Sequence, residues 1–263
     1  MKLLVITPTL GTSRWLDEAA RSVAAVRGEI QHVMVCPPPV AADLGRRFPR
    51  VTIVGEKRAG LYPAINQGLA AVVDWEAFMW LNDDDVLEPD GLGAALAVLA
   101  AAPGPDVVYG RVGLMGAAGE RLGALPVARR ADDLRALLAR GIVPLAQPGT
   151  VMRRTLVTRL GGLDESFRLA GDLDLFARAL AAGGRFAWVD REVASFRLTA
   201  AQLSKDDATG AVEKLRALQA LGPAGPAGGR AALWRFRWAN LGVYFERVRR
   251  HGFVTMRHLY RHA

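Results

Sequence analysis

Three consecutive aspartates directly follow an apolar segment, residues 77–82, in the first third of the chain. Asp83, Asp84 and Asp85 repel one another when ionised, although an ordinary turn needs only one Asp or Asn. A hard divalent cation, Mg²⁺ or Mn²⁺, offsets this repulsion when carboxylates hold it against the oxygens of a diphosphate. The alternative is a solvated acidic turn before the next helix, with Asp90 as its cap. The triplet therefore predicts either a metal–diphosphate site or an acidic turn.

A second polar pattern comes shortly before the triplet. Gly60, Tyr62, Asn66 and Gly68 stand in the order G-x-Y-x-x-x-N-x-G. Tyr62 and Asn66 are four residues apart, so both can face one side of a helix. Alone, the pattern predicts only a capped amphipathic helix, but combined with the triplet it becomes a specific signal.

Strands and helices alternate around these residues. Their expected order predicts an α/β domain with a Rossmann-like, mostly parallel sheet flanked by helices. In such sheets ligands bind outside the carboxyl ends of the strands, which is where the triplet falls. Strands are expected over 2–9, 30–36, 51–56, 77–82, 106–116 and 185–198, and helices over 13–27, 62–73, 91–102 and 131–140.

Positive charge is concentrated at the end of the chain. The net charge is +8, and residues 230–263 contain eight Arg and one Glu, a net charge of +7. The nearly neutral remainder disfavours a nucleic-acid-binding surface and predicts a local basic element. Residues 222–229, rich in Gly and Pro, resemble a linker. We therefore expect a domain over 1–221, a linker over 222–229 and a basic, aromatic helical tail over 230–263.

The sequence shows no signal for export or membrane insertion. No window approaches about 18 uninterrupted apolar residues. The N-terminal segment has a short apolar run without a cleavage site, so it predicts a strand rather than a signal peptide. The single Cys36 cannot form an internal disulfide, which suits a reducing compartment. We expect a cytoplasmic protein, peripheral on the inner face of the membrane if the tail binds lipid.

Further motifs follow in a fixed order along residues 2–204. VITPT at 5–9 ends the first strand, and residues 147–154 read Q-P-G-T-V-M-R-R. Later segments are G-G-L-D-E-S-F at 161–167, A-G-D-L-D-L-F-A-R at 170–178 and F-R-L-T-A-A-Q-L-S at 196–204. Together with G-x-Y-x-A-x-N-x-G and L-N-x-D-D, this series resembles the family 2 glycosyltransferases of the GT-A fold.

The resemblance implies an inverting glycosyltransferase that moves a sugar from a nucleotide-sugar donor to a hydroxyl acceptor, in surface or secreted glycan assembly. By position, Asp172 matches the catalytic base. Asp83 and Asp85 match the ligands of Mn²⁺ or Mg²⁺, with Asp85 the most direct and Asp84 near the ribose or the metal shell. A glycan or a lipid-linked molecule is the implied acceptor. The implied nucleotide- and substrate-binding residues are Thr7, Pro8, Thr9, Glu56, Arg58, Gly60, Tyr62, Asn66, Asp83, Asp84 and Arg197.

Asp174 competes with Asp172 for the role of base. Their segment has a helical pattern, so the two side chains diverge by about 200° and cannot both face one substrate. Asp172 could also cap the helix over 173–181, and one residue can fill both roles. Arg178 is expected to be structural, either in an ion pair with a neighbouring carboxylate or on a solvated face.

Two features depart from the family pattern. The second strand is followed by Cys36–Pro39 rather than by an acidic turn that reads the base of the nucleotide, and Asp43 is only a distant substitute. Thr199 stands where many GT-A enzymes have a metal-binding His. Either water would complete the coordination shell of the metal, or Arg197 would compensate electrostatically at the diphosphate. His32 is expected in the core or on the surface rather than at a metal.

Two alternatives stay open. A sugar-1-phosphate nucleotidyltransferase also uses an α/β sheet and acidic metal ligands, but its phosphate-binding loop needs several glycines, and Leu10–Arg14 contains one. A degenerate GT-A protein could act as a binding or scaffold subunit. The two departures favour this reading, while Asp85 and Asp172 oppose it.

The tail shows helical spacing of apolar residues. Trp234, Trp238, Leu241, Phe245 and Val248 fall on one helical face, with arginines beside it. Such a face could lie on an anionic membrane surface, which would suit a lipid-linked acceptor. It could equally pack on the catalytic domain or on a second subunit of a homo-oligomer.

Overall fold

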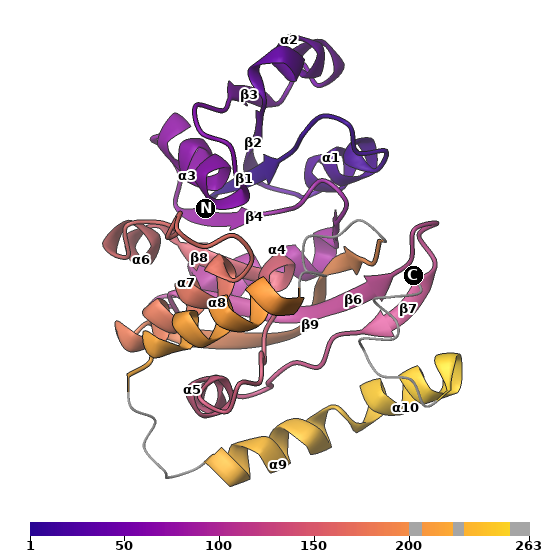
Figure 1. Cartoon of the computed structure of the whole chain (residues 1–263), viewed down its shortest axis with the longest axis vertical. Helices are drawn as coiled ribbons and strands as arrows, with labels where there is room; N and C mark the ends of the chain where they lie inside the picture. The colour runs from indigo at the N-terminus through magenta and orange to yellow at the C-terminus, as the bar shows by residue number, and fades with distance from the viewer. Residues whose placement is uncertain (200–206, 223–228, 253–263) are drawn as a thin grey trace.

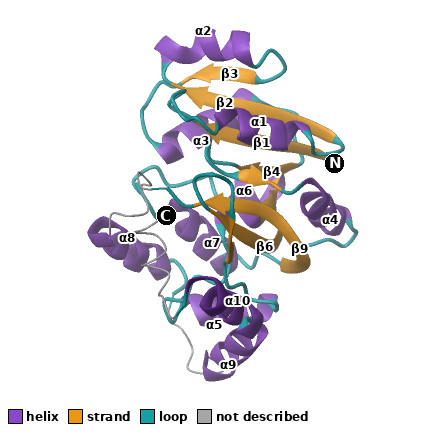
Figure 2. Ribbon diagram, turned by 90° about the vertical axis from the view of Figure 1, so that its right-hand side faces the viewer, coloured by secondary structure: helices purple, strands orange, loops and turns teal. Residues whose placement is uncertain are grey.

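The computed structural model describes residues 1–199, 207–222 and 229–252 (Figure 1). Strands run through the length of the molecule with helices on both sides, and the two last helices lie at the end opposite to β2 and β3 (Figures 1 and 2). The Q-x-S stretch at 202–204 and most of the expected linker lie outside the described residues.

All six strands expected from apolar runs are present, and three short ones, β5, β7 and β8, were not anticipated. The expected boundaries differ from the observed ones by a few residues. The strands are β1 Lys2–Pro8, β2 Glu29–Cys36, β3 Thr52–Gly55, β4 Ala77–Trp80, β5 Val86–Leu87, β6 Val107–Met115, β7 Arg121–Ala124, β8 Thr150–Arg153 and β9 Phe186–Arg197.

Helix α2 shows why one expectation was incomplete. Three prolines end the second strand as expected, but a helix begins among them, because proline is well tolerated in the first turn, where an N–H would lack a partner anyway. The helices are α1 Leu16–Ala24, α2 Pro38–Arg47, α3 Leu61–Ala71, α4 Pro89–Ala100, α5 Leu134–Leu138, α6 Arg154–Arg159, α7 Gly171–Ala181, α8 Asp207–Gln219, α9 Gly229–Ala239 and α10 Leu241–His251, with short 3₁₀ turns η1 Ala131–Asp133 and η2 Gln147–Gly149.

The sheet has a parallel half and a mixed half. Its order is β3-β2-β1-β4-β8-β6-β9-β5, with β7 beside β6. The pairs β1–β2, β2–β3 and β1–β4 are parallel, so the chain leaves these strands along one edge. Beyond β4 the pairing is mixed, because β8 is antiparallel to both β4 and β6 while β9 is parallel to β6. The segments that follow β1, β3 and β4 therefore meet at the same edge.

Alternate side chains of β1 enter two different cores. Leu3 and Val5 pack on one face of the sheet with α1 and α4, while Leu4 and Ile6 pack on the other with α3 and α7. All four are fully buried, and burying each such side chain stabilises the fold by about 1.5–3 kcal/mol. The central strand is thus covered on both faces, as expected for a parallel sheet.

The tail begins with a helix that joins the main core. Ala232 and Phe236 of α9 are buried in the same cluster as Leu134 and Leu137 of α5. The continuous helix expected in this region is interrupted at Asn240, whose buried side chain donates to the Val127 and Phe236 carbonyl oxygens at 3.0 and 2.7 Å and accepts from the Val127 N–H at 3.0 Å. Among the described residues, none of the helices is both long and apolar enough to cross a membrane.

Helix α4 approaches β9 so closely that only glycine fits at one position. A Cβ on Gly91 would lie 1.7 Å from the Glu192 carbonyl oxygen, whereas a Cβ on Gly93 would meet nothing within 4 Å. We predict that Gly91→Ala lowers the free energy of unfolding by about 1–3 kcal/mol, because the helix must move away from the strand. Gly93→Ala, the matched control in the same helix, should raise it by up to about 1 kcal/mol.

Urea denaturation of the two variants measures this difference. Equal effects would contradict the close approach of α4 to β9.

Candidate active site

A cavity of about 930 Å³ opens at the edge where the parallel strands end. Its walls come from the segments after β1, β3 and β4, from the start of α3, from η2 and from the start of α7. Of the expected site residues it contains Pro8, Thr9, Glu56, Gly60, Tyr62, Asp83, Asp84 and Asp172. The topology thus places side chains from distant parts of the sequence around one space.

Asp83 is fixed by the loop after β1. Its carboxylate accepts a hydrogen bond from the Thr9 hydroxyl at 2.5 Å, and its carbonyl oxygen accepts one from Ser13 Oγ at 3.0 Å. Burial raises the pKa of Asp83. Ser13 therefore joins the first loop to the acidic triplet.

Asp84 shares the cavity wall with Asp83. Burial, together with the charge of Asp83, raises the pKa of Asp84 to about 6. Two neighbouring carboxylates held out of water favour a counter-charge, and their oxygens are the donors that Mg²⁺ and Mn²⁺ prefer.

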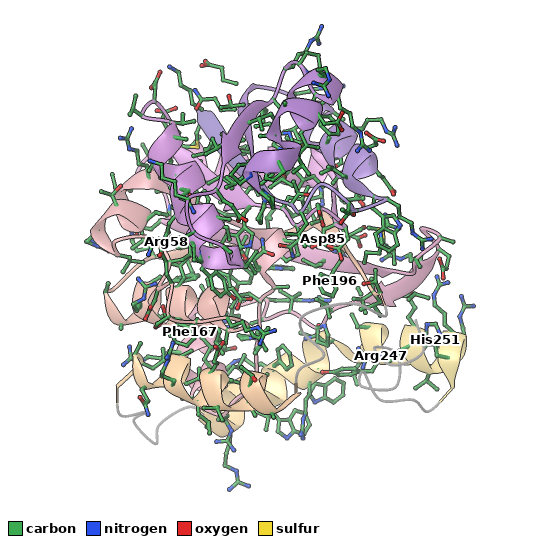
Figure 3. All side chains as sticks on the ribbon, turned by 45° about the horizontal axis from the view of Figure 1, so that its top comes forward. Arg58, Asp85, Phe167, Phe196, Arg247 and His251 are labelled. Atoms are coloured by element: carbon green, nitrogen blue, oxygen red, sulfur yellow. The ribbon has the colours of Figure 1, made fainter. Side chains whose placement is uncertain are left out.

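Asp85 points into the protein rather than into the cavity, which differs from the expectation that it is the most direct metal ligand. It is fully buried, and its carboxylate accepts from the Arg197 N–H at 2.9 Å and from Asn82 Nδ2 at 3.3 Å. Burial, and then the charge of Asp84, holds the pKa of Asp85 well above its usual range. Figure 3 shows Asp85 beside Phe196, the neighbour of Arg197. The carboxylate therefore anchors the triplet to β9.

Arg197 lies beneath the acidic triplet, not on the cavity wall where it was expected. Its side chain is 1% exposed and donates to the carbonyl oxygens of Asp84 at 2.8 Å and Gly116 at 3.2 Å. It also pairs with Glu18 at 2.6 Å. A guanidinium with these partners holds the loop in place rather than meeting a ligand.

The oxygen donors at the cavity fit a divalent cation with few protein ligands. Among the described residues no group of three His, Cys, Asp or Glu side chains could hold a metal by itself. Magnesium sites, however, commonly use one or two carboxylates, several waters and the phosphates of a substrate. Asp83 and Asp84 supply such a pair, and Thr199, buried on the same cavity, supplies a further hydroxyl.

Asp172 stands across the cavity at the start of α7. Its Oδ1 accepts from the Leu173 N–H at 2.8 Å, and the residue preceding the helix is Ala170, so Asp172 lies inside the first turn rather than at the cap. Burial raises the pKa of Asp172 to about 6. A carboxylate with this pKa is deprotonated at neutral pH yet basic enough to accept a proton.

Asp174 is directed away from this space, as the helical geometry predicts. It is 6% exposed and accepts from Arg178 Nε at 2.7 Å. Arg178 also donates to the Leu160 carbonyl oxygen at 2.8 Å and to that of Gly162 at 3.0 Å. The expected ion pair of Arg178 is therefore observed, and it secures α7.

Tyr62 positions the beginning of α7. Its hydroxyl accepts from the Gly171 N–H at 2.8 Å, and a Cβ on Gly171 would lie 2.6 Å from the Tyr62 ring. Only glycine lets the helix approach the ring this closely. Tyr62 lines the cavity, but its hydrogen bond acts on the residue before Asp172.

Asn66, one turn further along α3, does not line the cavity. It donates to the Leu163 carbonyl oxygen at 2.8 Å and to Glu165 Oε1 at 2.9 Å, and it accepts from the Leu163 N–H at 3.0 Å. Tyr62 and Asn66 thus face one side of the helix as expected, and both hold the chain that leads to Asp172.

Two other expected residues also lie off the cavity. Thr7 is fully buried and shares a 2.9 Å hydrogen bond with His32, and burial lowers the pKa of that imidazole to about 4. Arg58 is exposed and pairs with Glu165 on the surface, well away from Asp85 in Figure 3.

Several cavity residues were not anticipated from the sequence. Gln147 donates to the Trp80 carbonyl oxygen at 2.5 Å, and its place in the Q-P-G-T motif was the available signal. Arg168, within the S-F-R segment before α7, is the one Arg or Lys on the described cavity wall. No local pattern marked the others, which are mostly apolar: Trp15, Leu125, Pro126, Ile142, Val143, Leu145 and Phe236.

We predict that Arg197→Leu lowers the free energy of unfolding by about 3 kcal/mol, because it leaves the buried carbonyl oxygens of Asp84 and Gly116 without a donor and Glu18 without its ion-pair partner. Arg191→Leu, an exposed arginine on the same strand, should change it by less than about 0.5 kcal/mol. Urea denaturation measures both. If both variants lower the free energy of unfolding by similarly small amounts, Arg197 does not support the loop.

Comparisons with known proteins relate this geometry to solved structures. No family model and no curated protein matches the sequence. S. aureus TarS 1–349 matches with a TM-score of 0.62 at 15% identity, over 98% of this chain and 77% of that one. The same TarS fragment in complex with UDP-GlcNAc gives 0.63 at 16%, over 98% and 78%.

A further match is the mannosyltransferase PcManGT from Pyrobaculum calidifontis, in complex with GDP-Man and Mn²⁺. Its TM-score is 0.57 at 17% identity, over 94% of this chain and 72% of that one. At sequence identities this low, these structural matches show a shared fold and nothing more. The chain therefore has the GT-A fold of these glycosyltransferases.

Proposed function

We propose that the protein transfers a sugar from a nucleotide-sugar donor to a hydroxyl acceptor with inversion. One observation carries the proposal: Asp172 and the Asp83–Asp84 pair line the same cavity at the carboxyl edge of the sheet. Ligands bind at this edge in open α/β sheets. The GT-A fold, shared with proteins solved with UDP-GlcNAc and GDP-Man, supports a nucleotide-sugar donor.

Asp172 acts as the general base in this proposal. A hydroxyl is a poor nucleophile, so its proton passes to Asp172 as its oxygen bonds to the anomeric carbon. The bond between that carbon and the diphosphate oxygen breaks on the opposite side, and the bonding electrons leave with the diphosphate. A single displacement of this kind inverts the anomeric configuration. The pKa of Asp172, about 6, suits the role.

Asp83 and Asp84 would hold Mg²⁺ or Mn²⁺. The cation supplies charge neutralisation for the leaving nucleoside diphosphate. Asp85 and Arg197 keep both carboxylates directed toward the cavity from below. Arg168 adds positive charge on the side of the cavity that carries Asp172.

The acceptor would occupy the apolar part of the cavity. Leu125, Pro126, Ile142, Leu145 and Phe236 line it and offer few hydrogen-bonding groups. This composition favours an acceptor with an apolar portion, such as a lipid-linked glycan, over a purely polar one. Such an acceptor suits the assembly of surface or secreted glycans by a protein facing the cytoplasm.

No observation favours the nucleotidyltransferase alternative, since Leu10–Arg14 offers a single glycine for a phosphate-binding loop. A scaffold role predicts nucleotide-sugar binding without transfer, or no binding. Incubation with UDP-, GDP-, dTDP- and CDP-linked sugars, with and without Mn²⁺, separates these cases when both donor binding and sugar transfer are measured.

We predict that Asp172→Asn lowers the transfer rate at least about 100-fold, because the amide cannot accept the proton. The donor should still bind, since Asp172 lies on the acceptor side. Donor binding is read as a thermal shift, which corresponds to about 2.7 kcal/mol at a hundredfold excess over Kd. Asp190→Asn, an exposed aspartate on β9, is the control and should leave both readouts unchanged.

A pH–rate profile makes the test specific for the base. In the wild type the rate should fall about tenfold per pH unit below about 6, because protonation of the raised carboxyl removes the base. Asp172→Asn should make this acidic limb shallower and leave only the contribution of Asp84, whose pKa is also raised to about 6. Full transfer by the variant, with an unchanged limb, would contradict the assignment.

A further inference from the structure

The outer face of the two last helices carries large apolar side chains that are at least half exposed. Trp234, Trp238, Leu241 and Phe245 are 64%, 59%, 50% and 73% exposed. The two indoles stack with centroids 5.5 Å apart. We call these four residues the aromatic stripe. These are four of the five residues of the face predicted from the sequence. Helix α9 packs on the domain through its other side, so of the alternatives left open, packing of this face on the described part of the domain is not observed.

Two arginines of α9 and α10 are paired with acids. Arg235 donates to both carboxylate oxygens of Asp133, at 2.5 and 2.9 Å, and Arg250 pairs with Glu246 at 3.0 Å. These charges are neutralised within the protein.

The arginines beside the stripe are not neutralised in this way. Arg230 lies four residues before Trp234 and Arg237 three residues after it, so both share its helical face, while Arg249 lies four residues after Phe245. All three are exposed and form no ion pair with any described residue. Exposed Arg129 borders a small cavity together with Trp238 and extends the positive surface, whereas Arg130 at the same cavity pairs with Asp132 at 3.5 Å.

A second copy of the chain is a poor partner for this face. Paired symmetrically, it would bring the same arginines together, and the only acid in α9 and α10, Glu246, is already engaged by Arg250. An anionic lipid surface instead complements the arginines while its acyl boundary receives tryptophan and phenylalanine. We propose that the aromatic stripe and its flanking arginines dock the protein on an anionic bilayer surface.

Docking in this way would bring the cavity near the bilayer. Phe236 lines the cavity from α9, while Trp234 and Trp238 leave the same helix on its exposed side. Figures 1 and 2 show α9 and α10 together along one end of the molecule, so one surface can meet a bilayer without burying the β1–β3 end. An acceptor embedded in the bilayer would then have a short path to the cavity, a consequence that rests on the proposed function.

Vesicle sedimentation without donor tests docking independently of transfer. Wild type should bind vesicles of phosphatidylcholine with about 30% phosphatidylglycerol and bind pure phosphatidylcholine far less, with salt weakening the binding. Trp234→Ala/Trp238→Ala should lower partitioning at least about tenfold. Arg230→Glu/Arg237→Glu should also lower it at least about tenfold, because each basic residue contributes about fivefold at an anionic surface.

Matched controls use other exposed surfaces. Val212→Ser/Leu215→Ser removes apolar side chains from α8, and Arg21→Glu/Arg27→Glu makes the same charge change near α1; neither should alter partitioning. The melting temperature of Trp234→Ala/Trp238→Ala should equal that of wild type, since both indoles are exposed. The proposal is overturned if wild type does not bind anionic vesicles, if the tryptophan variant unfolds earlier, or if light scattering shows that it dissociates a dimer.

Discussion

The candidate site depends on one buried interaction, the contact of Arg197 and Asp85 beneath the acidic triplet. Three adjacent carboxylates cannot all face a cavity without strong repulsion and desolvation. The chain resolves this by turning Asp85 inward onto the backbone of β9, and the Arg197 guanidinium binds the Asp84 carbonyl from the same side. Two carboxylates are thereby left on the cavity wall, as a cation with bound diphosphate requires.

The opposite wall is held by separate contacts. Tyr62 fixes the Gly171 N–H, and Asn66 fixes the turn at Leu163, so helix α3 sets where α7 begins and where Asp172 lies. The two walls thus rest on different elements, β9 for the triplet and α3 for the base. This division allows the pKa of each carboxyl group to be set by its own surroundings, which is a recurrent way of separating catalytic roles.

The sequence predicted those parts of the fold that depend on local pattern. The apolar run of β1 and the helical spacing before Asp174 each have a period that identifies the element and its buried side. The inward turn of Asp85 could not be predicted, because its partner, Arg197, lies 112 residues away. In the tail both helical faces carry aromatic residues, so the pattern could not decide that Phe236, rather than the stripe, enters the core. The acidic residues of the site were therefore predictable, while its apolar wall and the direction of individual side chains were not.

The central claim, that the cavity holds a cation and a nucleotide sugar between Asp84 and Asp172, is tested most directly by diffraction. Crystals grown with Mn²⁺ and a nucleoside diphosphate should give an anomalous manganese peak at the Asp84 carboxylate, with the diphosphate on the side facing Asp172. A peak at Asp85 instead, or nucleotide bound outside this cavity, would contradict the account.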